Sequence, residues 1–384
     1  MLAGHDEEMP LTPTDVETAL DWGTAVARRS SEVPRRRRLW PRSRGFLVGE
    51  GAVFIESVAA GPWSRHPLFL HRWTAESVLT PSAEPRRSSG CGLDVLLPGP
   101  RRSDDAFRFR GFLLAERPAG ERRSVVVQQR RQPGVPNPLV AGLELQATLV
   151  GQIPLVVPRV LDVGALDHGT VRLDWAVEEM LDGHPVPLEG TGDALAEAVQ
   201  LLQETWIRTG TRHLPLRAGQ RDRALAGWTA LVADPPPGGW PADVDAGALT
   251  ARVVALLGDG RGLTVGVTHG DPSVGNMLRM PDGGLALVDW EFAARRHVAH
   301  DVAKVIRSAP DPVVFAGELG CAATLRTRME STGALPWPLQ VAAALLVFLG
   351  EWRPRHARSV SRGRGEHAAR GLRTAVRLVD VLTG

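Results

Sequence analysis

The spacing of apolar residues divides the chain into a β-rich part and a helical part. Near the start, apolar residues recur close to the helical repeat from Val16 to Val26, which predicts one amphipathic helix over residues 13–29. Short apolar stretches separated by Gly and Pro follow over residues 44–79, and they are typical of short strands. We therefore expect residues 1–90 to form an N-terminal extension that is rich in β-structure.

The next stretch, residues 91–180, has the pattern of an antiparallel sheet. Three strand candidates, CGLDVLLPG, FRFRGFLLAE and SVVVQQRR, precede a helical pattern over residues 139–151. The second and third are joined by RPAGERR, a connection with Pro and Gly that is typical of a hairpin. Two more strand candidates follow, IPLVVPRVLDVG and TVRLDWAVEEM. This order predicts a five-stranded sheet with one helix after the third strand.

Beyond Gly192 the pattern becomes helical. Apolar residues from Leu195 to Trp206 share one helix face at spacings of three, four, seven and eleven. Residues 233–247 are rich in Pro and Gly, which predicts an exposed loop between two helices. The chain again has a helical pattern from Asp301 to its end. Strands followed by helices predict a protein of the α+β class.

Composition excludes several classes of protein. The chain has 384 residues, of which 43% are hydrophobic, as in ordinary globular proteins. Its longest apolar run, residues 341–350, is about half of what a bilayer span needs. The acidic N-terminus lacks the features of a signal peptide, and two cysteines cannot form a disulfide framework. We therefore expect a cytoplasmic protein without a membrane partner.

The chemistry-bearing residues gather in residues 266–304, GVTHGDPSVGNMLRMPDGGLALVDWEFAARRHVAHDVAK. A short strand ends at Asp271, and the loop PSVGN leads into MLRM. The turn PDGG joins MLRM to LALVDW, which ends at Asp289. A hairpin of this kind brings Asp271, Asn276 and Asp289 to one end. Carboxylate and amide oxygens are the hard ligands that Mg²⁺ prefers, and a further carboxylate can orient a hydroxyl nucleophile.

This segment resembles the signature of the aminoglycoside phosphotransferase/choline kinase family, His269-Gly270-Asp271-x4-Asn276 followed by Asp289-Trp290-Glu291. The resemblance covers about residues 90–380. It implies that Asp271 is the catalytic base, that His269 braces the catalytic loop, and that Asn276 and Asp289 hold Mg²⁺ against ATP or GTP. It also implies a supporting role for Asp301 in HDVAK.

The resemblance further implies a bilobal, protein-kinase-like fold. Residues 91–187 would form the N-lobe, a small antiparallel sheet with one helix, together with the linker between the lobes. Residues 188–384 would form the mostly helical C-lobe with its catalytic and metal-binding loops, and residues 1–90 would be added to this core. The linker WAVEEMLDG would line the adenine pocket, with Glu178, Glu179 and Met180 beside the nucleotide.

The predicted N-lobe departs from the family pattern at one important position. The family has a third-strand lysine that contacts the phosphates and pairs with a helix glutamate, for which Glu144 is the match here. Lys304 is the only lysine of the chain, and it lies in the other lobe. In its place SVVVQQRR offers Gln128, Gln129 and Arg130, of which Arg130 carries the charge. The loop over residues 98–105 also lacks a glycine-rich phosphate-binding pattern.

The charge of the C-terminal region bears on the acceptor. After Lys304 the chain has eleven arginines against six acidic residues, which argues against a polycationic acceptor. We therefore expect the hydroxyl to belong to a neutral or anionic small molecule or natural product, or to a Ser or Thr of a peptide. The extension favours the peptide, because a β-rich segment flanked by arginines can bind an acidic leader by strand addition.

One alternative of another class remains open at this point. A catalytically weak pseudokinase that acts as a binding module would explain the missing lysine, whereas intact Asp271, Asn276 and Asp289 favour an enzyme. Aromatic residues make up only 5% of the chain and no recognition motif is present, which argues against nucleic-acid binding. Nothing in the sequence indicates an oligomeric state.

Overall fold

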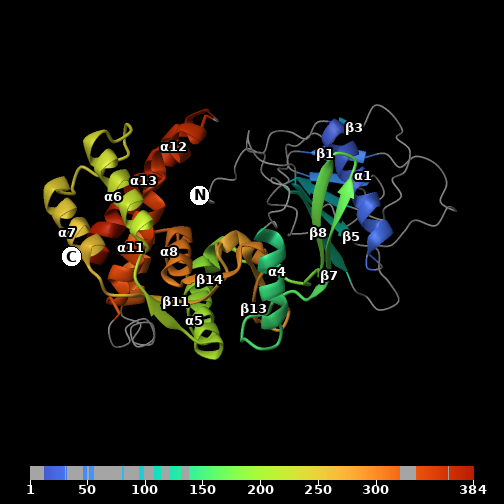
Figure 1. The fold of residues 1–384 in the computed structure, drawn as a ribbon, viewed down its shortest axis with the longest axis horizontal. Coiled ribbons are helices and arrows are strands. Elements are labelled where there is room, and N and C mark those ends of the chain that lie inside the picture. Colours follow the sequence, from blue (N-terminus) through green and yellow to red (C-terminus); the bar gives the residue numbers. More distant parts are fainter. Residues whose placement is uncertain are drawn as a thin grey trace.

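The fold is α+β and divides into two lobes. The computed structural model describes residues 13–30, 32, 46–49, 52–55, 80–81, 95–98, 108–113, 122–130, 138–320, 334–361 and 363–384. A sheet with helix α1 (Pro13–Arg29) lies at one end of the molecule, and a group of helices forms the other (Figure 1). Helix α4 (Pro138–Leu149) lies between them. The α+β class, the small sheet and the helical second lobe are as predicted, whereas residues 98–105 fall mostly outside the described residues.

The first lobe is built on one antiparallel sheet in the order β3-β1-β2-β4-β5-β6-β8-β7. Its strands are β1 (Phe46–Gly49), β2 (Ala52–Ile55), β3 (Thr80–Pro81), β4 (Val95–Pro98), β5 (Arg108–Leu113), β6 (Arg123–Gln129), β7 (Val160–His168) and β8 (Val171–Glu179). Strands β4 to β8 are the five that the sequence predicted. The strands of the extension continue the same sheet, because β2 pairs with β4.

Helix α1 has the bounds that its apolar spacing predicted, and it is attached to the sheet. Its buried residues include Trp22 and Val26, and the helix lies against β5 and β7. Two polar contacts fix it to β7: His168 Nε2 lies 2.6 Å from Asp21 Oδ2, and the Ser30 hydroxyl donates to Asp162 over 2.5 Å. The predicted extension therefore packs on β5 and β7 through helix α1 and joins the sheet through its strands.

Helix α4 connects the two lobes by packing. Leu139, Leu143 and the inward face of the sheet at Val126 form a small apolar cluster. On the side of the second lobe, a Cβ at Gly142 would lie 2.5 Å from the carbonyl oxygen of Glu291. Glycine is needed here because the helix backbone approaches the second lobe too closely for any side chain.

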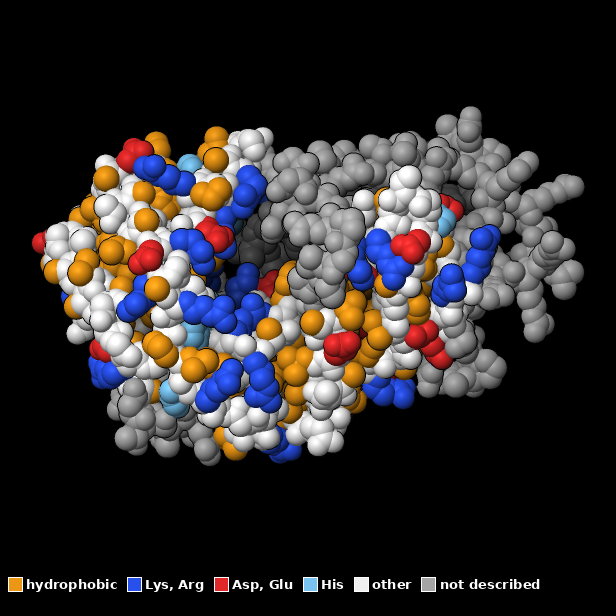
Figure 2. Space-filling view, viewed as in Figure 1, with side chains coloured by type: hydrophobic (Ala, Val, Ile, Leu, Met, Phe, Trp, Pro, Cys, Tyr) orange, Lys and Arg blue, Asp and Glu red, His pale blue; other side chains and the backbone are white. Residues whose placement is uncertain are grey.

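The second lobe is a helical assembly around one large core, and on the face drawn in Figure 2 its surface carries Lys and Arg side chains among hydrophobic ones. Its helices are α5 (Thr191–Thr209), α6 (Ala218–Ala233), α7 (Ala246–Gly258), α8 (Ala299–Ser308), α9 (Pro312–Gly320), α11 (Trp337–Leu349), α12 (Trp352–Ser361) and α13 (Gly365–Thr383). Residues 341–346 of α11 are all buried, so the apolar run noted in the sequence is the centre of this core. In the described part of the chain, no helix is both long and apolar enough to cross a bilayer.

Short strands carry the chemistry-bearing segment. Strand β11 (Leu263–Thr268) pairs with β10 (Arg212–Leu214) and β14 (Ala294–His297). Strands β12 (Met277–Arg279) and β13 (Leu285–Leu287) form the predicted hairpin, and β12 also pairs with β9 (His184–Pro185). The described residues also include the 3-10 turns η2 (Leu188–Gly190), η3 (Val274–Asn276) and η4 (Trp290–Phe292).

Candidate active site

The loop that carries Asp271 is held by a buried carboxylate. Asp301, at the start of α8, is fully buried and accepts hydrogen bonds from the backbone N–H groups of His269 (2.7 Å) and Gly270 (2.9 Å). Burial raises the pKa of Asp301 to about 6, against the opposing effect of the Gly270 N–H. Gly270 has a φ of 95°, a backbone conformation that favours glycine. Asp301 therefore fixes the turn from which Asp271 projects, and its supporting role in catalysis stays a prediction.

His269 braces this loop against the neighbouring strand. Its ring is fully buried, and burial lowers the pKa of His269 to about 4. The neutral ring can therefore donate from Nε2 to the carbonyl of Val288 (2.8 Å) while Nδ1 accepts from the Asp271 N–H (3.2 Å). Trp290 packs edge-on against it at 4.6 Å between ring centroids. His269 thus joins the Asp271 loop to the segment before Asp289.

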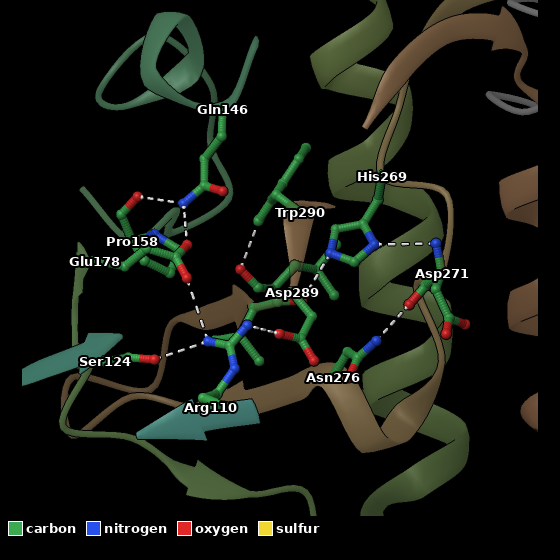
Figure 3. Close-up of polar contacts among 12 residues, drawn as sticks. Arg110, Ser124, Gln146, Pro158, Glu178, His269, Asp271, Asn276, Asp289 and Trp290 are labelled. Carbon is green, nitrogen blue, oxygen red and sulfur yellow. Dashed lines mark hydrogen bonds and ion pairs between the residues drawn. The ribbon is translucent and has the colours of Figure 1, made fainter. Parts of the chain in front are cut away.

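Asp271, Asn276 and Asp289 come together at one end of the β12–β13 hairpin (Figure 3). The Asn276 amide donates to the backbone carbonyl of Asp271 (2.9 Å), so its side-chain oxygen is the atom available to a ligand. Asp289 has a φ of 66°, the left-handed conformation, and its side chain is 30% exposed. One amide oxygen and one carboxylate at a partly open position are a donor set that fits Mg²⁺.

Arg110 on β5 completes this cluster, although the sequence did not single it out. Its guanidinium donates to Ser124 Oγ (2.9 Å) and Glu178 Oε2 (3.2 Å), and it also contacts the Asp289 carboxylate (Figure 3). Burial alone would lower the pKa of Arg110, but the charges of Asp289 and Glu178 raise it above its ordinary value. A buried carboxamide from α4, Gln146, donates to Glu178 Oε1 over 2.8 Å.

Three of the predicted nucleotide-binding residues lie outside this cluster. Arg130 forms an ion pair with the buried Asp174, and its Nε lies 3.0 Å from Asp174 Oδ2. It follows the end of β6 that is farther from the linker. Gln129 is its half-buried neighbour on the same strand. Glu144 is exposed on α4, because the buried face of that helix passes through Leu143 and Gln146 instead.

The linker residues divide between the site and the outer surface. Glu178 points to the cluster, whereas Glu179 forms an ion pair with Arg159 over 3.0 Å. The backbone N–H groups of Glu179 and Met180 already donate to the carbonyls of Arg159 and Arg122. A cavity of about 320 Å³ lies beside these residues and reaches Met280. In the structure as described, Glu179 and Met180 therefore offer no free N–H to a nucleotide.

The only lysine of the chain lies at the predicted catalytic base. Lys304 Nζ is 3.1 Å from Asp271 Oδ1. One turn further along α8, the guanidinium of Arg307 lies 3.9 Å from the centroid of the Phe348 ring, and Arg355 lies 4.3 Å from the same centroid. The sequence could have indicated this placement, because Asp301, Lys304 and Arg307 are three residues apart and such spacing puts all three on one side of a helix.

The sequence profile of the phosphotransferase enzyme family matches residues 107–330, more than half of the chain. No curated protein sequence matches.

Similar solved structures include a microcompartment-associated aminopropanol kinase (16% identity, 71% of this chain and 87% of that chain, TM-score 0.44). Another is the apo form of a thermostable mutant of aminoglycoside phosphotransferase APH(4)-Ia (15% identity, 74% of this chain and 94% of that chain, TM-score 0.43). A third is the amicoumacin kinase hAmiN in complex with AMP-PNP, Ca²⁺ and Ami (14% identity, 71% of this chain and 85% of that chain, TM-score 0.43). These likenesses are remote, and the family assignment rests on the sequence profile.

Proposed function

Because this chain belongs to the phosphotransferase enzyme family, as its signature residues predicted, we propose that it transfers the γ-phosphate of a nucleoside triphosphate to a hydroxyl. The nucleotide is ATP or GTP, and the metal is Mg²⁺. The observation that carries the proposal is the meeting of Asp271, Asn276 and Asp289 at one end of a hairpin, with Asp271 braced by His269.

Each residue of this group has a role in the proposed reaction. Phosphoryl transfer passes through a loose transition state, so an enzyme mainly positions the reactants and neutralises charge. Asp271 would accept the proton of the acceptor hydroxyl and hold its oxygen in line with the γ-phosphate. Asn276 and Asp289 would hold Mg²⁺, which would offset the negative charge of the phosphates.

The cations beside Asp271 support a neutral or anionic acceptor. Lys304 pairs with Asp271, and the guanidinium groups of Arg307 and Arg355 both lie over the Phe348 ring. Burial, and then the charge of Arg355, lowers the pKa of Arg307 to about 10. Among the residues that the structure describes, no carboxylate forms an ion pair with Arg307. A polycation would be repelled at such a surface, whereas an acceptor with a carboxylate or phosphate would be attracted.

A peptide Ser or Thr is the second candidate acceptor. It is favoured by one observation: β1, β2 and β3 of the extension continue the N-lobe sheet to its edge, where an extended leader peptide can add as a strand. Binding of a serine-rich acidic peptide to the full chain, measured by fluorescence anisotropy, tests this. Loss of that binding on Thr80→Pro, a substitution in the edge strand β3, supports strand addition if the melting temperature is unchanged; absence of binding contradicts the peptide candidate.

The experiment that tests the proposed function is transfer of label from γ-labelled ATP or GTP in the presence of Mg²⁺. The acceptors are matched hydroxylated compounds that are anionic, neutral or polycationic. We expect transfer to anionic or neutral members, its loss in Asp271→Ala, and its retention in Asp222→Ala, which removes an exposed aspartate of α6. Nucleotide binding without transfer to any acceptor would favour the pseudokinase alternative.

A further inference from the structure

The strand that should carry the phosphate-binding lysine has no cation facing the site. The side chains of β6 on the inner face of the sheet are Ser124, Val126 and Gln128, because alternate residues of a strand share a face. Val126 is fully buried against Leu139 and Leu143 of α4. Strand β6 therefore supplies a hydroxyl, an apolar side chain and a neutral carboxamide to this face, and the charge must come from elsewhere.

The neighbouring strand supplies that charge at the matching position. Arg110 of β5 is the register partner of Val126 across the β5–β6 ladder. Its side chain lies on the inner face, since it donates to the Ser124 hydroxyl. From there it reaches across to the second lobe and contacts Asp289, one of the two predicted metal ligands (Figure 3). Among the residues that the structure describes, Arg110 is thus the cation that reaches from the sheet to Asp289, the predicted metal ligand.

The carboxylate that pairs with this arginine also comes from a different element than in protein kinases. In protein kinases the strand lysine pairs with a glutamate of the helix behind it. Here the carboxylate is Glu178, which comes from β8 and is 3% exposed, and α4 supplies Gln146 instead. Gln146 Nε2 donates both to Glu178 Oε1 and to the carbonyl of Pro158, each over 2.8 Å. The helix therefore acts on the cation through Glu178 rather than directly.

A guanidinium suits this arrangement better than an ammonium would. It has five N–H donors in a planar fork, so it can bond Ser124 and Glu178 on one side and still present donors on the other. In the structure that other side faces Asp289. Arg–phosphate contacts have the same charge-assisted geometry as Arg–carboxylate contacts.

We propose that Arg110 is the phosphate-binding cation of this protein, supplied from β5 in place of a lysine on β6, with Glu178 and Gln146 as its positioning residues. The inference rests on the proposed function, since it presumes a nucleoside triphosphate at the site. With the triphosphate bound, the Arg110 guanidinium would donate to phosphate oxygens in place of Asp289, and the Asp289 carboxylate would then be available to hold the metal.

The test is equilibrium binding of ATP, with Mg²⁺, and of adenosine to the full chain by isothermal titration calorimetry. Because the charge acts on the phosphates, we expect Arg110→Gln to weaken ATP binding about tenfold or more and to leave adenosine binding unchanged. Arg110→Lys should recover part of the loss. Arg172→Gln, which removes a half-exposed arginine of β8, is the matched control and should bind ATP normally.

A double variant covers the case in which Arg110→Gln fails to fold because Glu178 is left buried without its cation. Arg110→Gln combined with Glu178→Gln removes both charges, and we expect it to fold and to show the same selective loss of ATP affinity. Unchanged ATP affinity in a folded variant would overturn the role of Arg110 and leave the proposed function intact. Absence of nucleotide binding in the unsubstituted chain would overturn the proposed function and the role of Arg110 with it.

Discussion

Lys304 Nζ lies 3.1 Å from Asp271 Oδ1, so the only lysine of the chain pairs with the predicted catalytic base. The two residues come from different elements, since Asp271 follows β11 and Lys304 lies in the middle of α8. The same helix contributes Asp301, which fixes the backbone of the loop before Asp271. Helix α8 therefore holds the backbone before Asp271 through Asp301 and the side chain of Asp271 through Lys304.

Removing the positive charge of Lys304 should affect turnover more than stability. The pair is half-exposed, with side-chain exposures of 41% and 33%, so we expect Lys304→Met to change the free energy of unfolding by less than about 1 kcal/mol. Turnover should fall about tenfold or more, because a cation beside the transferring phosphate stabilises its charge. Steady-state kinetics and urea unfolding of the same preparation check this. Unchanged kcat in Lys304→Met would contradict the role, and Lys304→Arg should retain more activity than Lys304→Met.

Asp301→Asn should destabilise the protein. A carboxylate can accept both N–H groups of His269 and Gly270, whereas an amide accepts with one atom and opposes the other N–H with its own donor. A buried, unsatisfied donor costs about 1–3 kcal/mol. Thermal and urea unfolding measure the loss, with Asp222→Asn on the surface of α6 as the control that should remain within error. Equal stability of the two variants would argue against the bracing role of Asp301.

Gly270→Ala tests the geometry of the catalytic turn. A Cβ at this position would lie 2.6 Å from the carbonyl oxygen of Phe292, and the φ of 95° is strained for any L side chain. We expect a loss of about 1–3 kcal/mol of unfolding free energy together with most of the activity. Gly219→Ala is the matched control, because its Cβ meets no atom within 4 Å. A Gly270→Ala variant as stable and as active as Gly219→Ala would contradict this geometry.

His300 makes a contribution to stability that depends on pH. Burial, and then the charges of His297 and Arg296, lowers the pKa of His300 to about 4 from 6.5. The folded state therefore binds fewer protons than the unfolded state, so this contribution is present above pH 6.5 and is lost as the pH falls towards 4.

Between pH 7.5 and pH 5, the unsubstituted chain should lose more unfolding free energy than His300→Gln does. We expect a difference of about 1 kcal/mol, since the ring is partly exposed. Urea unfolding of both proteins at both pH values gives this difference directly, and any titration that they share cancels in it. The same pH dependence in both would show that His300 is not the group responsible.

The elements were largely predictable because their patterns are local. The apolar spacing from Val16 to Val26 gave the bounds of α1, and the turn PDGG predicted the β12–β13 hairpin. The meeting of Asp271, Asn276 and Asp289 followed from that hairpin, because each of them lies at a strand end. Local patterns of this kind depend on backbone periodicity and turn chemistry, both of which are visible in one sequence.

The cation that faces Asp289 was not predictable in the same way. Strand alternation puts Arg108 and Arg110 on one face of β5 and Phe109 on the other, and the sequence FRFRGF does not decide which of the two faces is the inner one. Gln146 rather than Glu144 faces the site because the buried stripe of α4 is fixed by its contact with η4, a long-range effect. The Lys304–Asp271 pair also joins residues more than 30 positions apart, and no local pattern reports such a contact.

Phosphoryl transfer that depends on Asp271 can be followed directly by ³¹P NMR of the full chain with ATP, Mg²⁺ and an anionic hydroxylated acceptor. We expect conversion of the γ-phosphate into a new phosphomonoester signal. That signal should disappear in Asp271→Ala and on chelation of the metal, and it should persist in Asp222→Ala. A phosphomonoester formed equally by Asp271→Ala would contradict the assignment of Asp271 as the catalytic base.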